Sequence, residues 1–119
     1  MITSEFARRF AQEWIDAWNS HDIAHILSHY TDDFEMSSPF IVQFTGGASG
    51  TLKGKEQVGA YWQDALQRLP DLRFDLLDVF CGVDSITLFY NSVAGKRATE
   101  VLFLNSERKV YKALAHYNV

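Results

Sequence analysis

The sequence predicts an α+β domain in which three N-terminal helices are seated in a curved antiparallel sheet. Apolar residues recur at helical spacing as far as Leu69, and from Leu72 onwards they alternate with polar residues as in strands. Helices first and a run of strands afterwards is typical of the α+β class. The chain has 119 residues, 47% of them hydrophobic, which suffices for one core. We therefore expect residues 1–119 to form a single domain.

The first predicted helix runs from Ser4 to Asn19. Thr3 or Ser4 can cap its start, because either hydroxyl can accept a hydrogen bond from a free amide of the first turn. Its apolar residues cover about half of the helix circumference, which is more than contact with one neighbouring helix requires. We therefore expect this helix to lie along a broad concave surface. Its large apolar residues recur at every fourth position: Phe6, Phe10, Trp14 and Trp18.

A short second helix follows, with Asp22 as its predicted cap. Its apolar side faces inward, which leaves His25 and His29 in solvent. Two histidines four residues apart can bind zinc, but a third ligand and the usual glutamate are missing from this pattern. We therefore expect no metal site here. Asp32 and Asp33 are expected in the turn that closes this helix.

One more helix and a set of strands complete the prediction. The helix starts at about Lys55 and ends before Pro70, which cannot continue it. Short connections between the later strands suit antiparallel hairpins, since a parallel crossover needs a dozen or more residues. The strands are expected at 34–37, 41–44, 72–80, 85–93, 98–105 and 109–119, with a glycine-rich loop at 46–50.

The last two strands carry apolar residues on both faces. In the last strand, the predicted inward set of Tyr111, Ala113, Ala115 and Tyr117 opposes Val110, Leu114 and His116. The helices can cover only the concave face of the sheet, so the convex face needs another partner. A second copy of the chain is the simplest partner. We expect a homodimer formed through Val101, Phe103, Leu114 and His116.

Charge and composition exclude several classes of function. The net charge is −4 and the pI is about 5.4, so the chain lacks the basic surface that binds nucleic acid or an acidic membrane. The single cysteine, Cys81, cannot form an intrachain disulfide. No stretch has the roughly 18 consecutive apolar residues of a membrane span. These features predict a globular protein of the cytoplasm.

Five parts of the chain form a set: Trp14 to Phe34, Ser38-Pro39, Gly54, Leu69 to Leu72, and Glu100 to Val110. Together they resemble the nuclear transport factor 2-like superfamily, specifically its SnoaL-like branch. No single motif is specific, but the order and spacing of the segments are. The resemblance implies a cone-shaped, strongly curved antiparallel sheet around the helices, a cystatin-like α+β barrel. It also implies a pocket that opens into the cone, and frequent homodimerisation through the sheet.

The family includes polyketide cyclases, ketosteroid isomerase, scytalone dehydratase, limonene epoxide hydrolase and proteins without catalytic activity, so the fold does not fix the function. The resemblance places the three catalytic roles of ketosteroid isomerase at Trp14, Ser38 and Glu100. Only Glu100, in the position of a protonated acid, is chemically matched. Trp14 is a bulkier donor than the family's tyrosine, and Ser38 without a neighbouring base accepts protons poorly. Steroid isomerisation by that mechanism is therefore disfavoured.

Glu100 is the main candidate for a catalytic residue. Leu102 and Leu104 share its strand face, so a Glu100 that faces the cone lies in an apolar setting. Burial without a cation raises the pKa of a carboxyl group and leaves a neutral acid or a base suited to proton transfer. The alternatives are a salt bridge with Arg97 or Arg73, or a position in water at the rim of the pocket.

Three functions remain open. The first is an acid/base enzyme, such as a cyclase, isomerase, dehydratase or hydrolase, acting on a small hydrophobic molecule with Glu100 and Ser38 as catalytic residues. The second is a non-catalytic binder of a small apolar ligand, and the third is a protein-association module. We expect no cofactor. The expected ligand-binding residues are Trp14, Trp18, Phe34, Met36, Trp62, Tyr90, Ala113, Ala115 and Tyr117, most of which could equally be plain core residues.

Overall fold

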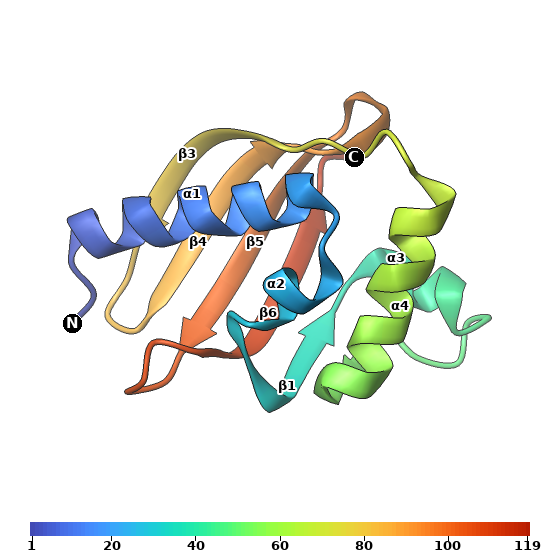
Figure 1. Cartoon of the computed structure of the whole chain (residues 1–119), viewed down its shortest axis with the longest axis horizontal. Coiled ribbons are helices and arrows are strands. Elements are labelled where there is room, and N and C mark those ends of the chain that lie inside the picture. The colour runs from blue at the N-terminus through green and yellow to red at the C-terminus, as the bar shows by residue number, and fades with distance from the viewer.

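The computed structural model describes residues 1–119 and has the α+β architecture that the sequence predicts. Six strands form one sheet, and the helices lie along one face and one end of it (Figure 1). No helix has both the length and the apolar character needed to cross a membrane. In chain order the elements are α1 (Ser4–Ser20), α2 (Ile23–Leu27), β1 (Tyr30–Ser37), α3 (Pro39–Phe44), β2 (Thr51–Lys53), α4 (Gly54–Arg68), β3 (Asp75–Cys81), β4 (Ser85–Asn91), the 3-10 helix η1 (Val93–Gly95), β5 (Arg97–Leu104) and β6 (Val110–Tyr117).

Helix α1 lies across the sheet, as the breadth of its apolar face predicts (Figure 1). The hydroxyl of Thr3 caps its start by accepting a hydrogen bond from the amide of Phe6. Phe10, Trp14 and Trp18 are buried, and they belong to one continuous hydrophobic core with the inner face of the sheet.

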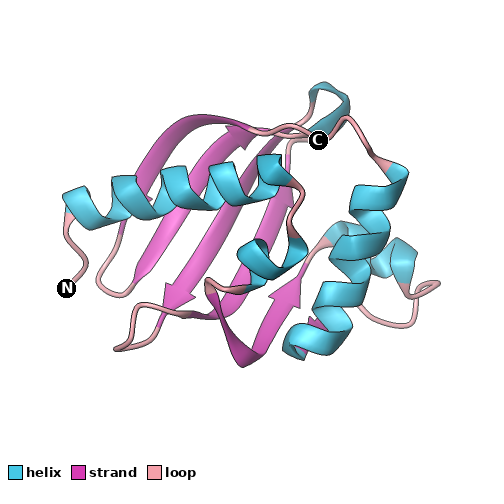
Figure 2. Cartoon of the chain, in the orientation of Figure 1, coloured by secondary structure: helices cyan, strands magenta, loops and turns pink.

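The sheet is mixed rather than purely antiparallel, which corrects the prediction. Its strand order is β2-β1-β6-β5-β4-β3, and β1 pairs with β6 in the parallel direction, with Tyr30 opposite Val110. The four hairpin-connected strands from β3 to β6 are antiparallel, as expected (Figure 2). The parallel pair joins strands far apart in the sequence, and such a pair needs no short turn between its members.

The arrangement of three N-terminal helices is not what the structure shows. Residues 41–44, predicted as a strand, belong to helix α3. Ser38 caps this helix and Pro39 occupies its first turn, and these two start signals outweigh the β-branched residues that follow. The long helix α4 comes after β1 and β2.

The turn expected at Asp32 and Asp33 is also corrected, because both residues lie in β1. Helix α2 is capped by Asp22 as predicted, but it ends at Leu27. His25 is exposed, whereas His29 is half-buried and its ring lies edge-on to Phe10, with ring centroids 5.5 Å apart. Burial lowers the pKa of His29.

A bulge near the start of β6 reverses two of the predicted orientations. Phe103 pairs with Lys112 and Leu104 pairs with Val110, so Tyr111 is an extra residue between the two pairs. Val110 is therefore fully buried and Tyr111 is 43% exposed, opposite to the expected faces. Beyond the bulge the predicted alternation holds, since Ala113 and Ala115 are buried.

Candidate functional site

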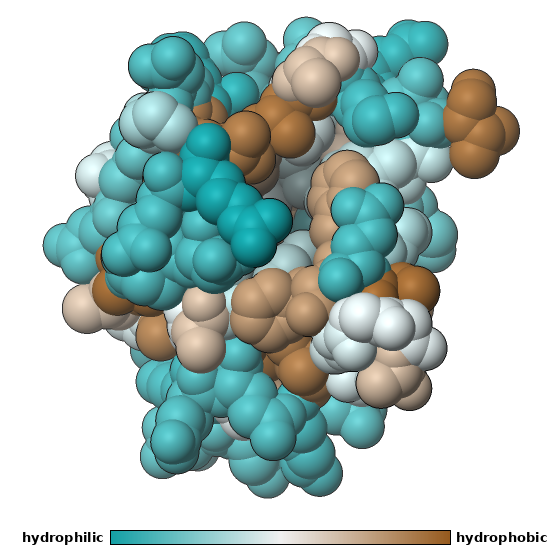
Figure 3. Space-filling model, turned by 90° about the vertical axis from the view of Figure 1, so that its right-hand side faces the viewer, coloured by the Kyte–Doolittle hydropathy of each residue, from teal (hydrophilic) through white to brown (hydrophobic).

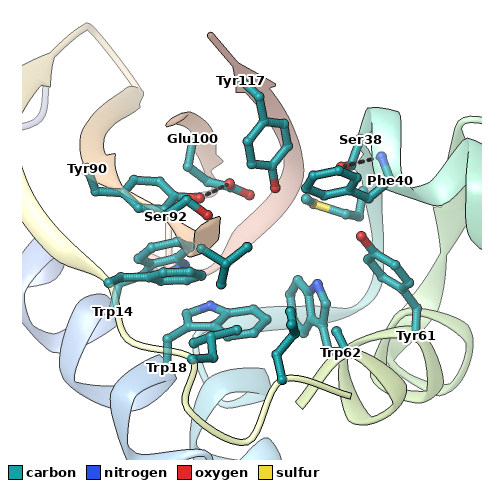
Figure 4. Close-up of a pocket in the computed structure, with 16 residues that line it drawn as sticks. Trp14, Trp18, Ser38, Phe40, Tyr61, Trp62, Tyr90, Ser92, Glu100 and Tyr117 are labelled. Carbon is teal, nitrogen blue, oxygen red and sulfur yellow. Dashed lines mark hydrogen bonds between the residues drawn. The ribbon is translucent and has the colours of Figure 1, made fainter. Parts of the chain in front are cut away.

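A pocket lies between α1, α4 and the inner face of the sheet (Figure 4). Its volume is about 80 Å³, several times the space that one water molecule needs. On the side of the molecule that carries α3 and α4, Figure 3 shows hydrophobic side chains grouped around a hollow. The lining residues are Trp14, Trp18, Met36, Ser38, Phe40, Tyr61, Trp62, Ala65, Leu69, Leu72, Phe74, Tyr90, Ser92, Val93, Glu100 and Tyr117.

Two polar side chains at the end of α1 hold one wall of the pocket in place. The amide nitrogen of Asn19 donates to the carbonyl of Phe74 at 2.9 Å, and its oxygen accepts from the amide of Phe74 at 2.7 Å. The Nε2 atom of His21 lies 2.8 Å from the carbonyl oxygen of Leu72. The segment that carries Leu72 and Phe74 is thereby fixed to the helix that carries the tryptophans.

Glu100 projects from β5 into the pocket and is 3% exposed (Figure 4). The hydroxyl of Tyr90 donates a hydrogen bond to its Oε1 atom at 3.1 Å. No cation forms a salt bridge with it: Arg73 pairs with Asp75, and Arg97 is exposed. Burial raises the pKa of Glu100 to about 8, against the smaller lowering effect of the Tyr90 hydrogen bond. At neutral pH this carboxyl group therefore holds a proton.

Three tyrosine hydroxyls point toward the same pocket from different elements (Figure 4). Burial raises the pKa of Tyr90, of Tyr117 and of Tyr61. Each rise is reinforced by the nearby charge of Glu100 when it is ionised. These hydroxyls consequently stay protonated near neutral pH and serve as hydrogen-bond donors or acceptors rather than as bases.

Ser38 is buried in the pocket lining, but its hydroxyl has a structural task. The oxygen accepts a hydrogen bond from the amide of Phe40 at 3.2 Å and so caps α3. It also acts on Tyr61 and Tyr117, where it partly offsets the rise in pKa. No base adjoins Ser38, and the arrangement equips it to position α3 rather than to take a proton.

The three tryptophans differ in what their indole nitrogens contact. The Nε1 atom of Trp14 donates to the hydroxyl of Tyr30 at 2.8 Å, so it is not free to donate to a ligand. Trp18 lies edge-on to Trp62 with ring centroids 5.0 Å apart. The Nε1 atom of Trp18 is buried and has no hydrogen-bond partner.

The structure brings most of the predicted site residues to one pocket. Phe34, Ala113 and Ala115 are the exceptions, since they are buried in the core and do not line it. Sequence reasoning missed Phe40 because it lies in the unpredicted helix α3. It also missed the loop between β4 and β5, because the sequence of a turn does not indicate which part of the protein the loop packs against. Sequence reasoning also missed Tyr61, although it lies within the third predicted helix beside the chosen residue Trp62.

No group of three or more His, Cys, Asp or Glu side chains is arranged to hold a metal ion. The rings of His25 and His29 lie 5.7 Å apart, near the surface and without a third ligand. Among the pocket residues, Glu100 is the only one with a carboxyl group, and none carries a positive charge.

Comparison with known proteins identifies relatives over the whole chain. The family model described as the SnoaL-like domain matches residues 11–110. The curated proteins compared with the chain include no match. The crystal structure of a SnoaL-like protein of unknown function from Burkholderia thailandensis is 55% identical, with a TM-score of 0.95 and complete coverage of both chains.

Two more distant structures share the fold. One is a protein of unknown function with a cystatin-like fold from Methylobium petroleophilum, which is 13% identical with a TM-score of 0.78; the match covers 99% of this chain and 79% of that one. The other is the epoxide hydrolase/cyclase-like enzyme SalBIII, described with a role in pyran ring formation in salinomycin. It is 14% identical with a TM-score of 0.78, over 100% of this chain and 95% of that one.

Proposed function

The chain belongs to the SnoaL-like family, and on that premise we propose that it is an acid/base enzyme that uses Glu100 to transfer a proton within a small, uncharged carbonyl compound. The ionised carboxylate takes a proton from the carbon next to the carbonyl group. It then returns a proton to another atom of the same molecule, so the reaction is an isomerisation without a net change in atoms. The tyrosine hydroxyls around Glu100 hold the carbonyl oxygen in place.

The observation that carries the proposal is the environment of Glu100. It is buried in the pocket with a hydroxyl donor and without a cation, and its pKa is raised to about 8. A proton carrier works best when its pKa lies close to the working pH, because both protonation states are then populated. A structural carboxylate would normally be paired or solvated, so this environment favours a chemical role.

The rest of the pocket lining indicates the class of substrate. No lysine, arginine or histidine lines the pocket, so an anionic substrate would meet no opposite charge. Aromatic and aliphatic side chains provide most of the surface, which suits an apolar ring or short chain. An adjoining hollow of about 390 Å³, which shares Phe40, Tyr61 and Leu69 with the pocket, offers room for a larger substrate to extend outward. The charged residues in this hollow, Asp64 and Arg68, are paired with each other.

A non-catalytic binder is the second candidate, and one observation favours it. The pocket holds only one group with a pKa near neutrality, whereas many acid/base enzymes use a separate acid and base. SalBIII shares the fold at 14% identity, and a shared fold does not assign a reaction to this chain.

Deuterium exchange tests the proposal without knowledge of the natural substrate. A panel of small cyclic ketones and enones is incubated with the protein in D₂O, and NMR follows loss of the hydrogen next to the carbonyl group. We expect exchange that accelerates as pH rises through about 8, because the ionised form of Glu100 is the base. Glu100→Gln should abolish it, since the amide keeps the shape of the acid and cannot take the proton.

Glu107→Gln is the matched control, because Glu107 is exposed in the turn between β5 and β6. This variant should exchange at the rate of the parent protein. Exchange that survives in Glu100→Gln would show that Glu100 is not the base. Ketones that bind without any exchange would identify the protein as a binder instead.

A further inference from the structure

The indole nitrogen of Trp18 is the one buried side-chain nitrogen or oxygen that lacks a hydrogen-bond partner. Burying a hydrogen-bond donor without an acceptor costs free energy, and such groups are rare in folded proteins. Trp14 precedes Trp18 by one turn of α1, and its indole nitrogen does have a partner in Tyr30. Burial in this core does not by itself leave a tryptophan without a hydrogen-bond partner, so the unpaired donor is specific to Trp18.

The position of Trp18 explains where an acceptor could come from. Trp18 is 5% exposed and lines the pocket that contains Glu100. Figure 4 shows the nitrogen-bearing edge of its ring turned toward the interior of the pocket. The nitrogen itself is closed to solvent, so a neighbouring side chain of the lining has to shift before a ligand atom can contact it. The ring is surrounded by Trp14, Trp62 and Phe74, whose ring centroids lie 6.1, 5.0 and 5.5 Å away.

We propose that the Nε1 hydrogen of Trp18 is a recognition donor that binds an uncharged acceptor oxygen of the ligand, such as a carbonyl, ether or epoxide oxygen. An indole nitrogen can only donate, so its partner has to be an acceptor. The pocket lacks a cation, which disfavours a carboxylate or phosphate oxygen in that place. The inference rests on the proposed function only in that the pocket is the ligand site.

This assignment gives Trp18 a role different from that of its aromatic neighbours. The neighbouring aromatic side chains favour any ligand with apolar surface. Trp18 instead increases the affinity for a ligand that has an acceptor oxygen at one position. A ligand without that oxygen would leave the indole donor unpaired in the complex, and discrimination of this kind is stronger than discrimination by shape alone. Trp18 is thus a residue that determines specificity.

Two probes of nearly equal shape separate these effects: cyclohexanone, and methylenecyclohexane, in which a CH₂ group replaces the oxygen. The chain has three tryptophans, so a ¹⁵N–¹H spectrum shows three indole signals, and single Trp→Phe variants assign them. We expect cyclohexanone to shift the Trp18 indole proton downfield, since it gains a hydrogen bond, and methylenecyclohexane not to do so. The Trp14 signal should change little with either probe.

Affinities provide the second measurement. The parent protein should bind cyclohexanone more tightly than methylenecyclohexane, and Trp18→Phe should reduce that preference about fivefold, the effect of one hydrogen bond. Trp14→Phe is the matched control, because it changes the same pocket wall without touching the free donor. Trp14→Phe should lower the affinity for both probes by a similar factor and leave the preference for cyclohexanone unchanged.

The results also separate this inference from the proposed function. A Trp18 signal that responds equally to both probes, or that does not respond, overturns the role of Trp18 even if Glu100 still catalyses exchange. A ketone-specific response in a protein without exchange supports the role of Trp18 and contradicts the catalytic proposal. Failure of both probes to bind overturns the ligand class, and the spectra of the parent protein decide the question even if Trp18→Phe does not fold.

Discussion

The indole nitrogen of Trp14 donates a 2.8 Å hydrogen bond to the hydroxyl of Tyr30, and both side chains are buried. This bond ties the middle of α1 to the first residue of β1. Its removal from either side leaves one buried polar group without its partner.

We therefore expect Trp14→Phe and Tyr30→Phe each to lower the free energy of unfolding, by about 2–4 kcal/mol and about 1–2 kcal/mol respectively. The larger value for Trp14 includes the volume that the smaller ring leaves empty. Urea denaturation of both variants and of the double variant measures the coupling between them. The double variant should be about 1 kcal/mol more stable than additivity predicts. Strictly additive losses would show that the bond contributes nothing to stability.

The pH dependence of stability provides a test of Glu100. The unfolded chain releases the Glu100 proton at about pH 4.5, whereas the folded chain keeps it up to about pH 8. Between these values the folded state binds more protons, so the free energy of unfolding falls with rising pH, by about 5 kcal/mol in total. Glu100→Gln should remove this loss.

Thermal melts at pH 5 and pH 9 measure the effect. The melting temperature of Glu100→Gln should be close to that of the parent protein at pH 5 and several degrees higher at pH 9. Glu107→Gln, at an exposed position, should follow the parent at both pH values. A Glu100→Gln variant that is less stable than the parent at pH 9 would mean that the carboxylate is stabilised in the fold.

The Tyr90 hydroxyl lowers the pKa of Glu100 by donating to it. Tyr90→Phe should therefore raise the pKa of Glu100 further, because a hydrogen bond that favours the charged form is lost. A ¹³C NMR titration of the carboxyl group gives the midpoint directly. Tyr117→Phe serves as the control, because Tyr117 has no hydrogen bond to Glu100 and its removal should move the midpoint less. Equal midpoints in the parent and Tyr90→Phe would contradict the role of this contact.

The convex face of the sheet remains a predicted dimer interface. Val101, Phe103 and Leu114 are half-buried in the single chain, and Tyr111 stands exposed beside Phe103 with ring centroids 6.3 Å apart. Light scattering should give twice the 13.6 kDa of one chain, and Phe103→Asp should reduce it to the single value. Val83→Asp, which adds the same charge at an exposed turn, should leave the dimer intact. A parent protein that has the mass of one chain at all concentrations would refute the interface.

The sequence alone predicts the elements whose signals are local. The four-residue spacing of Phe6, Phe10, Trp14 and Trp18 predicts α1 correctly. The alternation around Glu100 predicts only that it shares a strand face with the buried leucines, and the structure shows that this face is the inner one. The parallel pairing of β1 with β6 could not be predicted, because the hydrophobic pattern of a strand does not indicate which other strand lies next to it in the sheet. The bulge at Tyr111 could not be predicted from the sequence either, because a bulge depends on how two strands pair.

The chemistry of the pocket is predictable in part. Glu100 among leucines already suggests a neutral acid, but its partner Tyr90 lies on another strand and becomes visible only through the register of β4 and β5. The difference between Trp14 and Trp18 has no trace in the sequence. It arises from whether a hydroxyl of another element reaches each indole nitrogen, as Tyr30 does for Trp14.

The position of β6 between β1 and β5 has a consequence for biosynthesis. A ribosome makes β1 early and β6 last among the strands, yet β6 is the strand that joins the β1–β2 pair to the rest of the sheet. Until residues 110–117 have left the ribosome, the sheet on which α1 and its tryptophans pack is incomplete. Apolar side chains that are buried in the finished core are then exposed to chaperones or to other nascent chains. The sheet is therefore expected to assemble only after β6 has been synthesised and has left the ribosome.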